Sequence, residues 1–271
     1  MAGPASVSDI DAGPAGLAVS LRAVTKIYDR GVMALGPLDL DVARGEFVSL
    51  LGPSGCGKST ALRLIAGLNA PTSGSIKVAH RADADRARHS IDFVFQEPTL
   101  MPWASVRENV RLPLKLAHVP ATAADARVGE ALAQVGLSEF ADAFPRELSG
   151  GMKMRVSLAR ALVTNPDILL MDEPFAALDE ITRFRLNNDL LALWRNLRKT
   201  VIFVTHSVFE SVYLSQRVIV MTARPGRISA EFRIDAPEPR GEDFRTSADY
   251  AGICRTVSSA LMPSYSGQGT S

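Results

Sequence analysis

One stretch of the sequence decides the fold: Gly52-Pro53-Ser54-Gly55-Cys56-Gly57-Lys58-Ser59-Thr60. It follows a short apolar run, Glu46 to Leu51, and it opens Lys58 to Leu68, where apolar residues recur at helical spacing. Its three glycines allow backbone N–H groups to curl around phosphate oxygens, and the helix that follows adds the partial positive charge of its N-terminus. The stretch therefore predicts a loop that binds a triphosphate, and all nine residues are candidate nucleotide-binding residues.

Two side chains of this phosphate loop have predicted roles of their own. Lys58 should reach the β- and γ-phosphates as a candidate catalytic residue, and the Ser59 hydroxyl should ligate Mg²⁺. Cys56 is expected to be a small packed residue and not a reactive thiol. A glycine-rich turn without function is the alternative, and the strand before the loop and the helix after it disfavour that alternative.

A second apolar run, Ile168-Leu-Leu-Met-Asp-Glu173, ends in two consecutive acids. Because successive side chains of an extended strand point in opposite directions, Asp172 can hold the metal while Glu173 faces an attacking water. Pro174 then ends the strand. A solvated strand end would be the default interpretation without a phosphate loop, and the presence of that loop favours a metal ligand and a general base.

A second glycine turn, Leu148-Ser-Gly-Gly-Met152, opens another helix near Gly151. Ser149, Gly150 and Gly151 are candidate phosphate-binding residues. One nucleotide does not need two such turns from one chain, so the hypothesis is that this turn caps a nucleotide held by another copy. Ser-Gly-Gly before a helix is equally an ordinary N-cap, and that alternative stays open.

The remaining patterns surround these motifs with strands and helices. Leu17 to Tyr28 alternates like an edge strand and can pair antiparallel with Leu38 to Val42. Strands that alternate with helices favour an α/β fold with a mainly parallel sheet covered on both faces. The further expected strands are Ile76 to Val78, Ile91 to Phe95, Ile168 to Met171, Val201 to Thr205 and Val218 to Met221, the last closing the sheet. The expected helices include Ala121 to Val135 and Glu180 to Arg198, and His80 to His89 is expected to be a solvated loop.

Composition excludes some classes of partner. The 271 residues include 30 Lys and Arg and 29 Asp and Glu, a net charge of +1, so no overall field draws the chain to nucleic acid. The two cysteines, Cys56 and Cys254, lack metal-site spacing, which suits a reducing compartment. No uncharged apolar run reaches the roughly 18 residues that span a bilayer. Residues 1–16 are expected to form a disordered leader without signal-peptide features.

The order of these motifs resembles the ABC ATPase family from Leu17 to Arg227. The resemblance implies a P-loop NTPase (RecA-like) core with a mainly parallel sheet, an antiparallel β subdomain and a helical insertion. It places the ATPase domain at 17–235, the helical subdomain at 97–160 and a partly mobile C-terminal extension at 236–271, whose last ten or so residues are expected to be mobile. The implied cofactors are ATP and Mg²⁺.

The same resemblance assigns roles to four further residues. Tyr28 matches the aromatic residue that stacks on adenine, and Gln96 matches the glutamine that acts at the metal site and couples it to the membrane partner. Ala177-Leu-Asp179 is similar to the D-loop at the dimer interface, and His206 is similar to the switch histidine that contacts the γ-phosphate. One position departs from the pattern, because Met152 stands where the family commonly has glutamine.

Three segments resemble the nitrate, sulfonate and taurine importer branch: Gln96 to Trp103, Leu148 to Arg155 and Asp172 to Arg183. Related members import thiamin precursors and other small solutes. The branch implies integral-membrane permease subunits, a solute-binding protein met only indirectly, a second and identical ATPase subunit, and peripheral attachment at the cytoplasmic face of the inner membrane. Pro98 to Trp103 can dock a permease helix, with packing inside the insertion as the alternative.

Three rival functions use part of this pattern. A soluble ABC ATPase of repair or translation would carry coiled-coil insertions or two fused ATPase units, and neither is visible in the sequence. A small-molecule kinase has no reason to contain the Leu148 to Met152 turn. A binding-only module could discard the water-activating acid, and Glu173 is retained.

Overall fold

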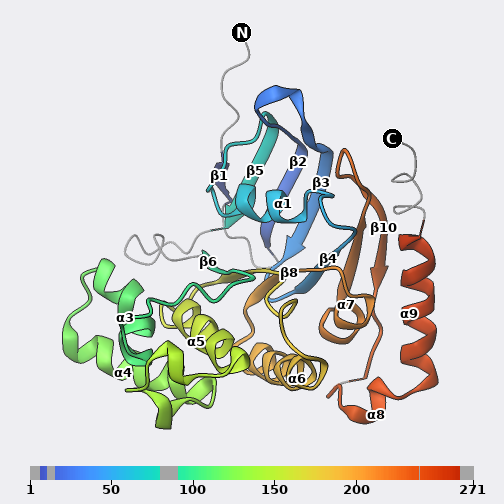
Figure 1. Cartoon of the computed structure of the whole chain (residues 1–271). Coiled ribbons are helices and arrows are strands. Elements are labelled where there is room, and N and C mark those ends of the chain that lie inside the picture. Colours follow the sequence, from blue (N-terminus) through green and yellow to red (C-terminus); the bar gives the residue numbers. More distant parts are fainter. Residues whose placement is uncertain (1–6, 11–15, 80–90, 238, 263–271) are drawn as a thin grey trace. The chain divides into compact units, whose positions relative to one another are not determined.

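The computed structural model describes residues 7–10, 16–79, 91–237 and 239–262 (Figure 1). The chain divides into two compact units. The first consists of Met1–Asp83 with Arg198–Ser271, and the second consists of Ala84–Leu197. The expected loop from His80 to His89 lies outside the described residues.

The first unit contains a mostly antiparallel sheet in the strand order β1-β5-β2-β3. Its strands are β1 (Val7–Ile10), β5 (Ser73–Ala79), β2 (Leu17–Ile27) and β3 (Met33–Ala43). β2 pairs antiparallel with β3, as the sequence predicts, and it also pairs antiparallel with β5. The expectation that β2 is an edge strand is therefore wrong. The consecutive residues from Ala18 to Leu21 are all buried, as suits an interior strand and not an unpaired edge.

Part of the expected disordered leader has a defined structure. Val7–Ile10 forms β1, which pairs in parallel with β5. β5 offers a strand edge here, and pairing satisfies backbone groups that a small polar segment cannot satisfy by itself. The rest of residues 1–15 lies outside the described residues.

The first unit also holds the parallel strands beside the phosphate loop. β4 (Phe47–Leu51) lies between β8 (Thr200–Thr205) and β9 (Arg217–Met221) and runs parallel to both. All five residues of β4 are buried, which is why it reads as a continuous apolar run. β9 does not close the sheet, because β10 (Ile228–Arg233) pairs antiparallel with it. The sequence patterns do not predict β10, whose residues alternate between partly buried and exposed.

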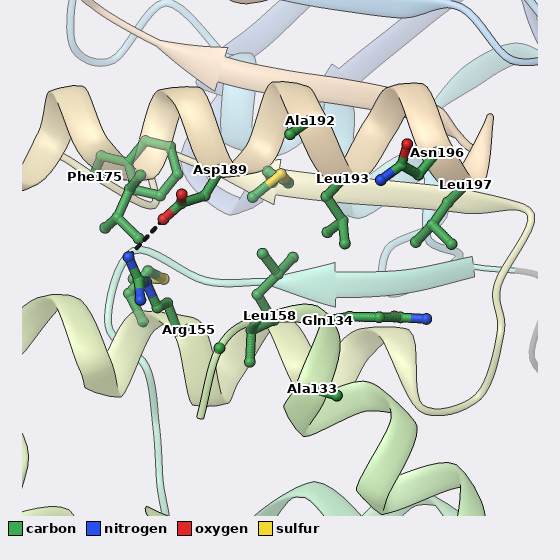
Figure 2. Close-up of a pocket in the computed structure, with 15 residues that line it drawn as sticks. Ala133, Gln134, Arg155, Leu158, Phe175, Asp189, Ala192, Leu193, Asn196 and Leu197 are labelled. Carbon is green, nitrogen blue, oxygen red and sulfur yellow. Dashed lines mark hydrogen bonds and ion pairs between the residues drawn. The ribbon is translucent and has the colours of Figure 1, made fainter. Parts of the chain in front are cut away.

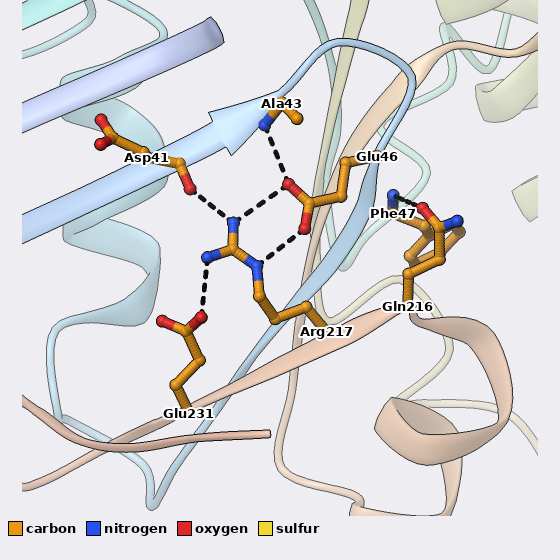
Figure 3. Close-up of polar contacts among 7 residues, drawn as sticks. All are labelled: Asp41, Ala43, Glu46, Phe47, Gln216, Arg217 and Glu231. Carbon is orange, nitrogen blue, oxygen red and sulfur yellow. Dashed lines mark hydrogen bonds and ion pairs between the residues drawn. The ribbon is translucent and has the colours of Figure 1, made fainter. Parts of the chain in front are cut away.

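An arginine ties β9 to its neighbours in the first unit (Figure 3). The Arg217 guanidinium donates to both carboxylate oxygens of Glu46, at 2.7 and 3.0 Å, and to Glu231 on β10 at 3.1 Å. It also donates to the backbone oxygen of Asp41 on β3. Both Arg217 and Glu46 are largely buried, with 13% and 17% of their side chains exposed. One fork of donors therefore joins three segments of the unit.

The first unit ends in two helices that the sequence patterns did not predict. α8 (Glu242–Arg245) and α9 (Ala248–Leu261) follow the last strand, and α9 (red in Figure 1) packs against α7 (Val208–Leu214). Most of the C-terminal extension is thus ordered around the core. Residues 263–271, which include the expected mobile end, lie outside the described residues.

The second unit combines a strand pair with helices. β6 (Ile91–Val94) runs parallel to β7 (Ile168–Asp172). The helices are α3 (Val106–Leu116), α4 (Ala121–Gln134), α5 (Gly150–Leu162) and α6 (Glu180–Leu197). α3 was missed because prolines flank it and Pro113 lies inside it, yet a capping box between Ser105 and Glu108 starts it.

The expected fold class is confirmed. Parallel strands, an antiparallel β subdomain and a helical segment inside residues 97–160 are all present. Among the described helices, none combines the length and the apolar character that crossing a bilayer requires.

Candidate functional site

The phosphate loop joins β4 to α1 (Lys58–Ile65), as the sequence predicts. Gly55 and Gly57 have φ angles of 75° and 93°, in the left-handed region that glycine adopts without strain. A Cβ atom on Gly57 would lie 2.7 Å from the backbone oxygen of Ala34, and one on Gly52 would lie 2.7 Å from the Met221 oxygen. Glycine is therefore required for both conformation and space, which is the form of loop that brings backbone N–H groups to phosphate oxygens.

Lys58 lies over this loop and is only 4% exposed. Its Nζ atom donates to the carbonyl oxygens of Gly52, at 2.7 Å, and Pro53, at 2.9 Å. The side chain thus folds back over the loop, and its ammonium group contacts the loop carbonyls. Cys56 beneath it is buried, and burial raises the pKa of its thiol, as expected of a packed and unreactive residue.

Tyr28 lies near the loop within the same unit. Its hydroxyl is 3.4 Å from the Thr60 hydroxyl and accepts a 3.4 Å hydrogen bond from Asn69. The Lys26 ammonium lies 5.2 Å from the centre of the Tyr28 ring, and the residue is 38% exposed. A partly exposed ring beside a phosphate loop is suited to stacking on a base.

His206 is next to the phosphate loop because of strand register. Leu51 at the end of β4 pairs with Thr205 at the end of β8. The two chains then leave the sheet at the same edge, one as Gly52 and the other as His206, and neighbouring strands lie about 4.8 Å apart. The exposed His206 side chain therefore belongs to the carboxyl edge where parallel sheets bind ligands.

The second unit brings three other candidates to one sheet edge. β6 pairs with β7 through Val94 and Met171, so Gln96 and the pair Asp172 and Glu173 follow at the same carboxyl ends. Gln96 is exposed, and both acids are half-buried. Carboxylate and amide oxygens are ligands that Mg²⁺ prefers, so Asp172 and Gln96 are chemically suitable ligands within this unit. Among the described residues, His, Cys, Asp and Glu form no group of three that could hold a metal.

One part of the strand argument for the acids is wrong. β7 ends at Asp172, and Glu173 has a φ angle of 46°, so it is not the next residue of an extended strand. The alternation of side chains along a strand therefore does not apply to this pair. A left-handed conformation at a residue other than glycine is uncommon and occurs at functional sites, where surrounding structure holds it. A tight turn, and not strand pleating, separates the two carboxylates.

The Ser149 turn lies at the start of α5. The Ser149 hydroxyl oxygen accepts a 3.3 Å hydrogen bond from the Met152 backbone N–H, so Ser149 is an N-cap. A Cβ atom on Gly151 would lie 2.7 Å from the Thr182 side chain, and one on Gly150 would lie 3.2 Å from Leu178. The two glycines allow close packing against the segment that contains Asp179. The hydrogen bonding of Ser149 is therefore that of an ordinary N-cap. Ser149 and Gly150 are exposed, so the N-terminus of α5 is open to solvent.

Asp179 organises the start of α6. Its carboxylate accepts a 2.9 Å hydrogen bond from the Thr182 backbone N–H, and this bond lowers the pKa of the exposed carboxyl. A charged oxygen at this position also complements the positive end of the helix. The predicted D-loop therefore ends in a fixed turn.

The segment Pro98 to Trp103 is braced from inside and presents its aromatic residue outward. Arg160 donates to the backbone oxygens of Pro98 and Thr99 at 2.8 and 2.9 Å. The buried Asn109 accepts from the Met101 N–H at 2.8 Å and donates to three carbonyl oxygens. Trp103 is 76% exposed, so packing inside the insertion does not explain it.

The described part of the second unit also has a cavity of about 550 Å³ that none of the predicted site residues lines (Figure 2). It lies among α4, α5 and α6, and its walls are mainly apolar. Arg155 and Asp189 form an ion pair of 2.6 Å at its edge.

Comparison with known proteins defines the class. The family model described as ABC transporter matches residues 35–176. The chain belongs to the ABC transporter family, and it is an ATP-binding subunit with the ATPase activity of that family.

Individual relatives are more specific. The chain is 50% identical to the taurine import ATP-binding protein TauB of Rhizobium johnstonii, over 77% of this chain and 79% of that protein. It is 46% identical to the aliphatic sulfonates import ATP-binding protein SsuB 1 of Pseudomonas savastanoi pv. phaseolicola, over 78% and 83%. Among solved structures, a dimeric ATP-binding cassette bound to ADP and Pi is similar, with 35% identity and a TM-score of 0.68, over 81% of this chain and all of that one.

Proposed function

We propose that this chain is the ATP-hydrolysing subunit that powers import of a small solute, of the taurine or sulfonate kind, through a separate membrane permease. The observation that carries the proposal is the register of β4 and β8, which brings the phosphate loop and His206 to one sheet edge. The import part of the proposal is supported by the relatives, which are named as taurine and aliphatic sulfonates import ATP-binding proteins. Nitrate and thiamin-precursor importers share the sequence resemblance and remain within the proposed solute class.

The first unit supplies nucleotide binding in this proposal. Tyr28 stacks on adenine, the loop N–H groups hold the phosphates, and Lys58 exchanges contacts with its own loop carbonyls for contacts with the β- and γ-phosphates. His206 balances the charge that develops on the γ-phosphate. Ser59 contributes a hydroxyl ligand to Mg²⁺.

The second unit supplies water activation. Glu173 acts as the general base that orients and deprotonates the attacking water, and Asp172 and Gln96 contribute oxygen ligands to the metal. Bound Mg²⁺ would neutralise charge on the β- and γ-phosphate oxygens. The left-handed backbone of Glu173 interrupts the extended strand after Asp172, which allows two neighbouring acids to serve different purposes.

A second copy of the chain completes the proposal. The Ser149 turn of each copy caps the ATP of the other, because an exposed helix N-terminus with two glycines suits a γ-phosphate. The Ser149 hydroxyl accepts from Met152, and its own hydrogen can still be donated to a phosphate oxygen. Asp179 lies at the interface of the two copies. ATP bound at that interface favours the closed pair, and hydrolysis releases it.

The permease is proposed to contact the segment Pro98 to Trp103. A protruding indole on a braced loop has the properties of an interface anchor, because little conformational entropy is lost when a partner covers it. This contact would place the chain peripherally at the cytoplasmic face of the inner membrane. A solute-binding protein would act through the permease and would not touch this chain.

The decisive experiment compares purified wild type with Glu173→Gln. Loss of ATP turnover by about a hundredfold, with an ATP-stabilised dimer in size-exclusion chromatography, is expected if Glu173 is the general base. The exposed Glu130 on α4 provides a control, and Glu130→Gln should hydrolyse ATP like wild type. Wild-type turnover by Glu173→Gln would remove Glu173 from the mechanism.

Import needs a separate test in cells that contain the chain with its own permease. Uptake of labelled taurine and of a labelled alkanesulfonate should be lost with Glu173→Gln and reduced with Trp103→Ala. Trp103→Ala should leave the ATP turnover of the isolated chain unchanged, because Trp103 is not among the residues proposed to bind ATP or to activate water. Uptake unaffected by Glu173→Gln would favour an ATPase without a transport role.

A further inference from the structure

We propose that Arg240 and Tyr250 are positioning residues for His206. In this inference the C-terminal extension holds α7 in place, and α7 fixes the backbone on both sides of His206. The inference rests on the proposed function, which gives His206 its contact with the γ-phosphate, and it assigns a role in ATP turnover to a part of the chain outside the nucleotide-binding motifs.

The first link joins His206 to α7. The neighbours of His206 in the chain are Thr205 and Ser207, and both are tied to Glu210. The Thr205 hydroxyl donates to the Glu210 carboxylate at 2.6 Å, and the Ser207 hydroxyl oxygen accepts from the Glu210 N–H at 3.3 Å. The Ser207 N–H also donates to the Thr205 hydroxyl oxygen at 3.0 Å. Thr205, Ser207 and Glu210 thus form a closed ring of hydrogen bonds. The ring fixes the backbone on both sides of His206 to the first turn of α7.

The second link is at the other end of α7. This helix has only seven residues, Val208–Leu214, and so short a helix is not stable by itself. The last carbonyl groups of a helix have no partner inside it, and here the Nη1 atom of Arg240 takes three of them. It donates to Tyr213 and Ser215 at 2.8 Å and to Val212 at 3.3 Å. Arg240 is 6% exposed, so these bonds are shielded from water.

Electrostatics of the helix favour the same arrangement. A buried carboxylate, Glu210, lies in the first turn of α7, and a buried guanidinium, Arg240, lies at its end. These signs complement the positive N-terminus and the negative C-terminus of the helix. The extension therefore supplies the charge that the C-terminus of α7 requires and that its own sequence lacks, since its last turn has no basic residue.

The third link is an aromatic contact along the side of α7. The Tyr250 hydroxyl on α9 donates to the Phe209 backbone oxygen at 2.8 Å, and its ring meets Tyr213 edge-on at a centroid distance of 6.4 Å. The extension contacts Tyr213 at a further point, because the Arg245 guanidinium lies 4.0 Å from the centre of the Tyr213 ring. Tyr213 is 1% exposed, and its hydroxyl donates to the Arg240 backbone oxygen at 3.3 Å.

These links predict which kinetic quantity changes. Loosening α7 would let the Thr205–Glu210 ring fluctuate and would displace the His206 side chain. The phosphate loop is carried by β4 and α1, whereas the hydrogen bonds of Arg240 and Tyr250 described above go to the α7 segment. Turnover should therefore fall while the affinity for ATP stays close to that of wild type.

The test measures kcat and the Kd for ATP in the full chain carrying Arg240→Met, Arg240→Lys or Tyr250→Phe. Arg240→Met should lower kcat about tenfold with Kd changed by less than about twofold, and Arg240→Lys should restore part of the loss. Tyr250→Phe removes one hydroxyl from a buried ring and should lower kcat by about threefold without unfolding the chain. Arg255 is exposed on α9, so Arg255→Met is the matched control and should behave like wild type.

A double-mutant cycle connects the effect to His206. If Arg240 acts through His206, Arg240→Met should lower kcat no further in a His206→Ala background. The ring NMR signal of His206, assigned by its loss in His206→Ala, should broaden or shift in Arg240→Met and not in Arg255→Met. Additive losses in the cycle, or an unchanged His206 signal in folded Arg240→Met, would overturn the inference.

The two levels of proposal fail in different ways. If His206→Ala lowers kcat while Arg240→Met and Tyr250→Phe do not, the positioning role is refuted and the proposed function stands. If His206→Ala and Glu173→Gln both hydrolyse ATP like wild type, the assigned mechanism is refuted and the positioning role with it.

Discussion

The Nζ atom of Lys58 donates a hydrogen bond of 2.7 Å to the backbone oxygen of Gly52, the first residue of the phosphate loop. The lysine thus stabilises its own loop, and a triphosphate must compete with loop carbonyls for the ammonium group. Lys58 therefore has a structural role in the loop in addition to its proposed role in phosphate binding.

Lys58→Met is expected to abolish ATP binding and also to destabilise the chain in the absence of nucleotide by about 2 kcal/mol, because two buried carbonyl oxygens lose a charged donor. Isothermal titration calorimetry and urea unfolding measure the two effects. Lys77 on β5 is exposed, so Lys77→Met should change neither quantity. Unchanged stability of Lys58→Met would show that the loop does not depend on its lysine.

Gly57 and Gly55 can separate steric clash from backbone strain. Both have left-handed φ angles, but a Cβ atom on Gly57 would meet the Ala34 oxygen at 2.7 Å, whereas one on Gly55 would meet nothing within 4 Å. Gly55→Ala should cost about 1 kcal/mol, the strain alone, and Gly57→Ala should cost clearly more and weaken ATP binding. Thermal unfolding of the two variants checks this order, and equal losses would contradict it.

The Ser149 turn allows a prediction about Met152. The cap uses the backbone N–H of Met152 and not its side chain, so Met152→Gln should retain the stability of wild type. Ser149→Ala removes the acceptor and should cost about 1 kcal/mol. It should also lower ATP turnover, since the proposed contact with the partner's nucleotide is lost. Urea unfolding and turnover of both variants are the measurements, and a destabilised Met152→Gln would show that the side chain matters.

The Arg217 cluster should be important for the stability of the first unit (Figure 3). Arg217→Met leaves the largely buried Glu46 carboxylate without its bidentate donor and should destabilise the chain by about 3 kcal/mol. Removing both charges, in Arg217→Met with Glu46→Gln, should cost less than the sum of the single changes. Arg22→Met removes an exposed ion pair with Asp41 and is the control, with a much smaller expected cost than that of Arg217→Met. Additive costs for Arg217 and Glu46 would indicate that the pair is not coupled.

Asp92 on β6 should make stability depend on pH. Burial raises the pKa of its carboxyl to about 7, although the Thr164 hydroxyl donates to it. The unfolded carboxyl has a pKa near 3.9, so between about pH 4 and pH 7 the folded chain holds a proton that the unfolded chain has lost. Stability conferred by the protonated form is complete below about pH 4 and is lost as pH rises to about 7.

Asp92→Asn should remove this dependence. The variant should be more stable than wild type at pH 8, by about 4 kcal/mol at most, and the two should converge near pH 4. Urea unfolding at several pH values is the measurement, and Asp142→Asn, which changes an exposed carboxyl, should follow the wild-type curve. Parallel curves for Asp92→Asn and wild type would show that Asp92 is not the responsible group.

The sequence by itself determined the class of fold and the order of the motifs. The phosphate loop needs glycines at fixed places, a strand before it and a helix after it, and these are local requirements that residue types reveal. The helical and strand periods of α4, α6, β7 and β8 were equally local, and their bounds were predicted to within one or two residues.

Only the tertiary structure decided which segments pair and which turns break a period. The interior position of β2, the addition of β10 beyond β9 and the left-handed turn at Glu173 depend on neighbours that are distant in the sequence or on a single φ angle. The bracing of Pro98 to Trp103 and the capping of α7 by Arg240 likewise join residues that no local pattern connects. The physical reason is that hydrophobic period and turn chemistry are set by adjacent residues, whereas pairing, capping and burial are set by long-range contacts.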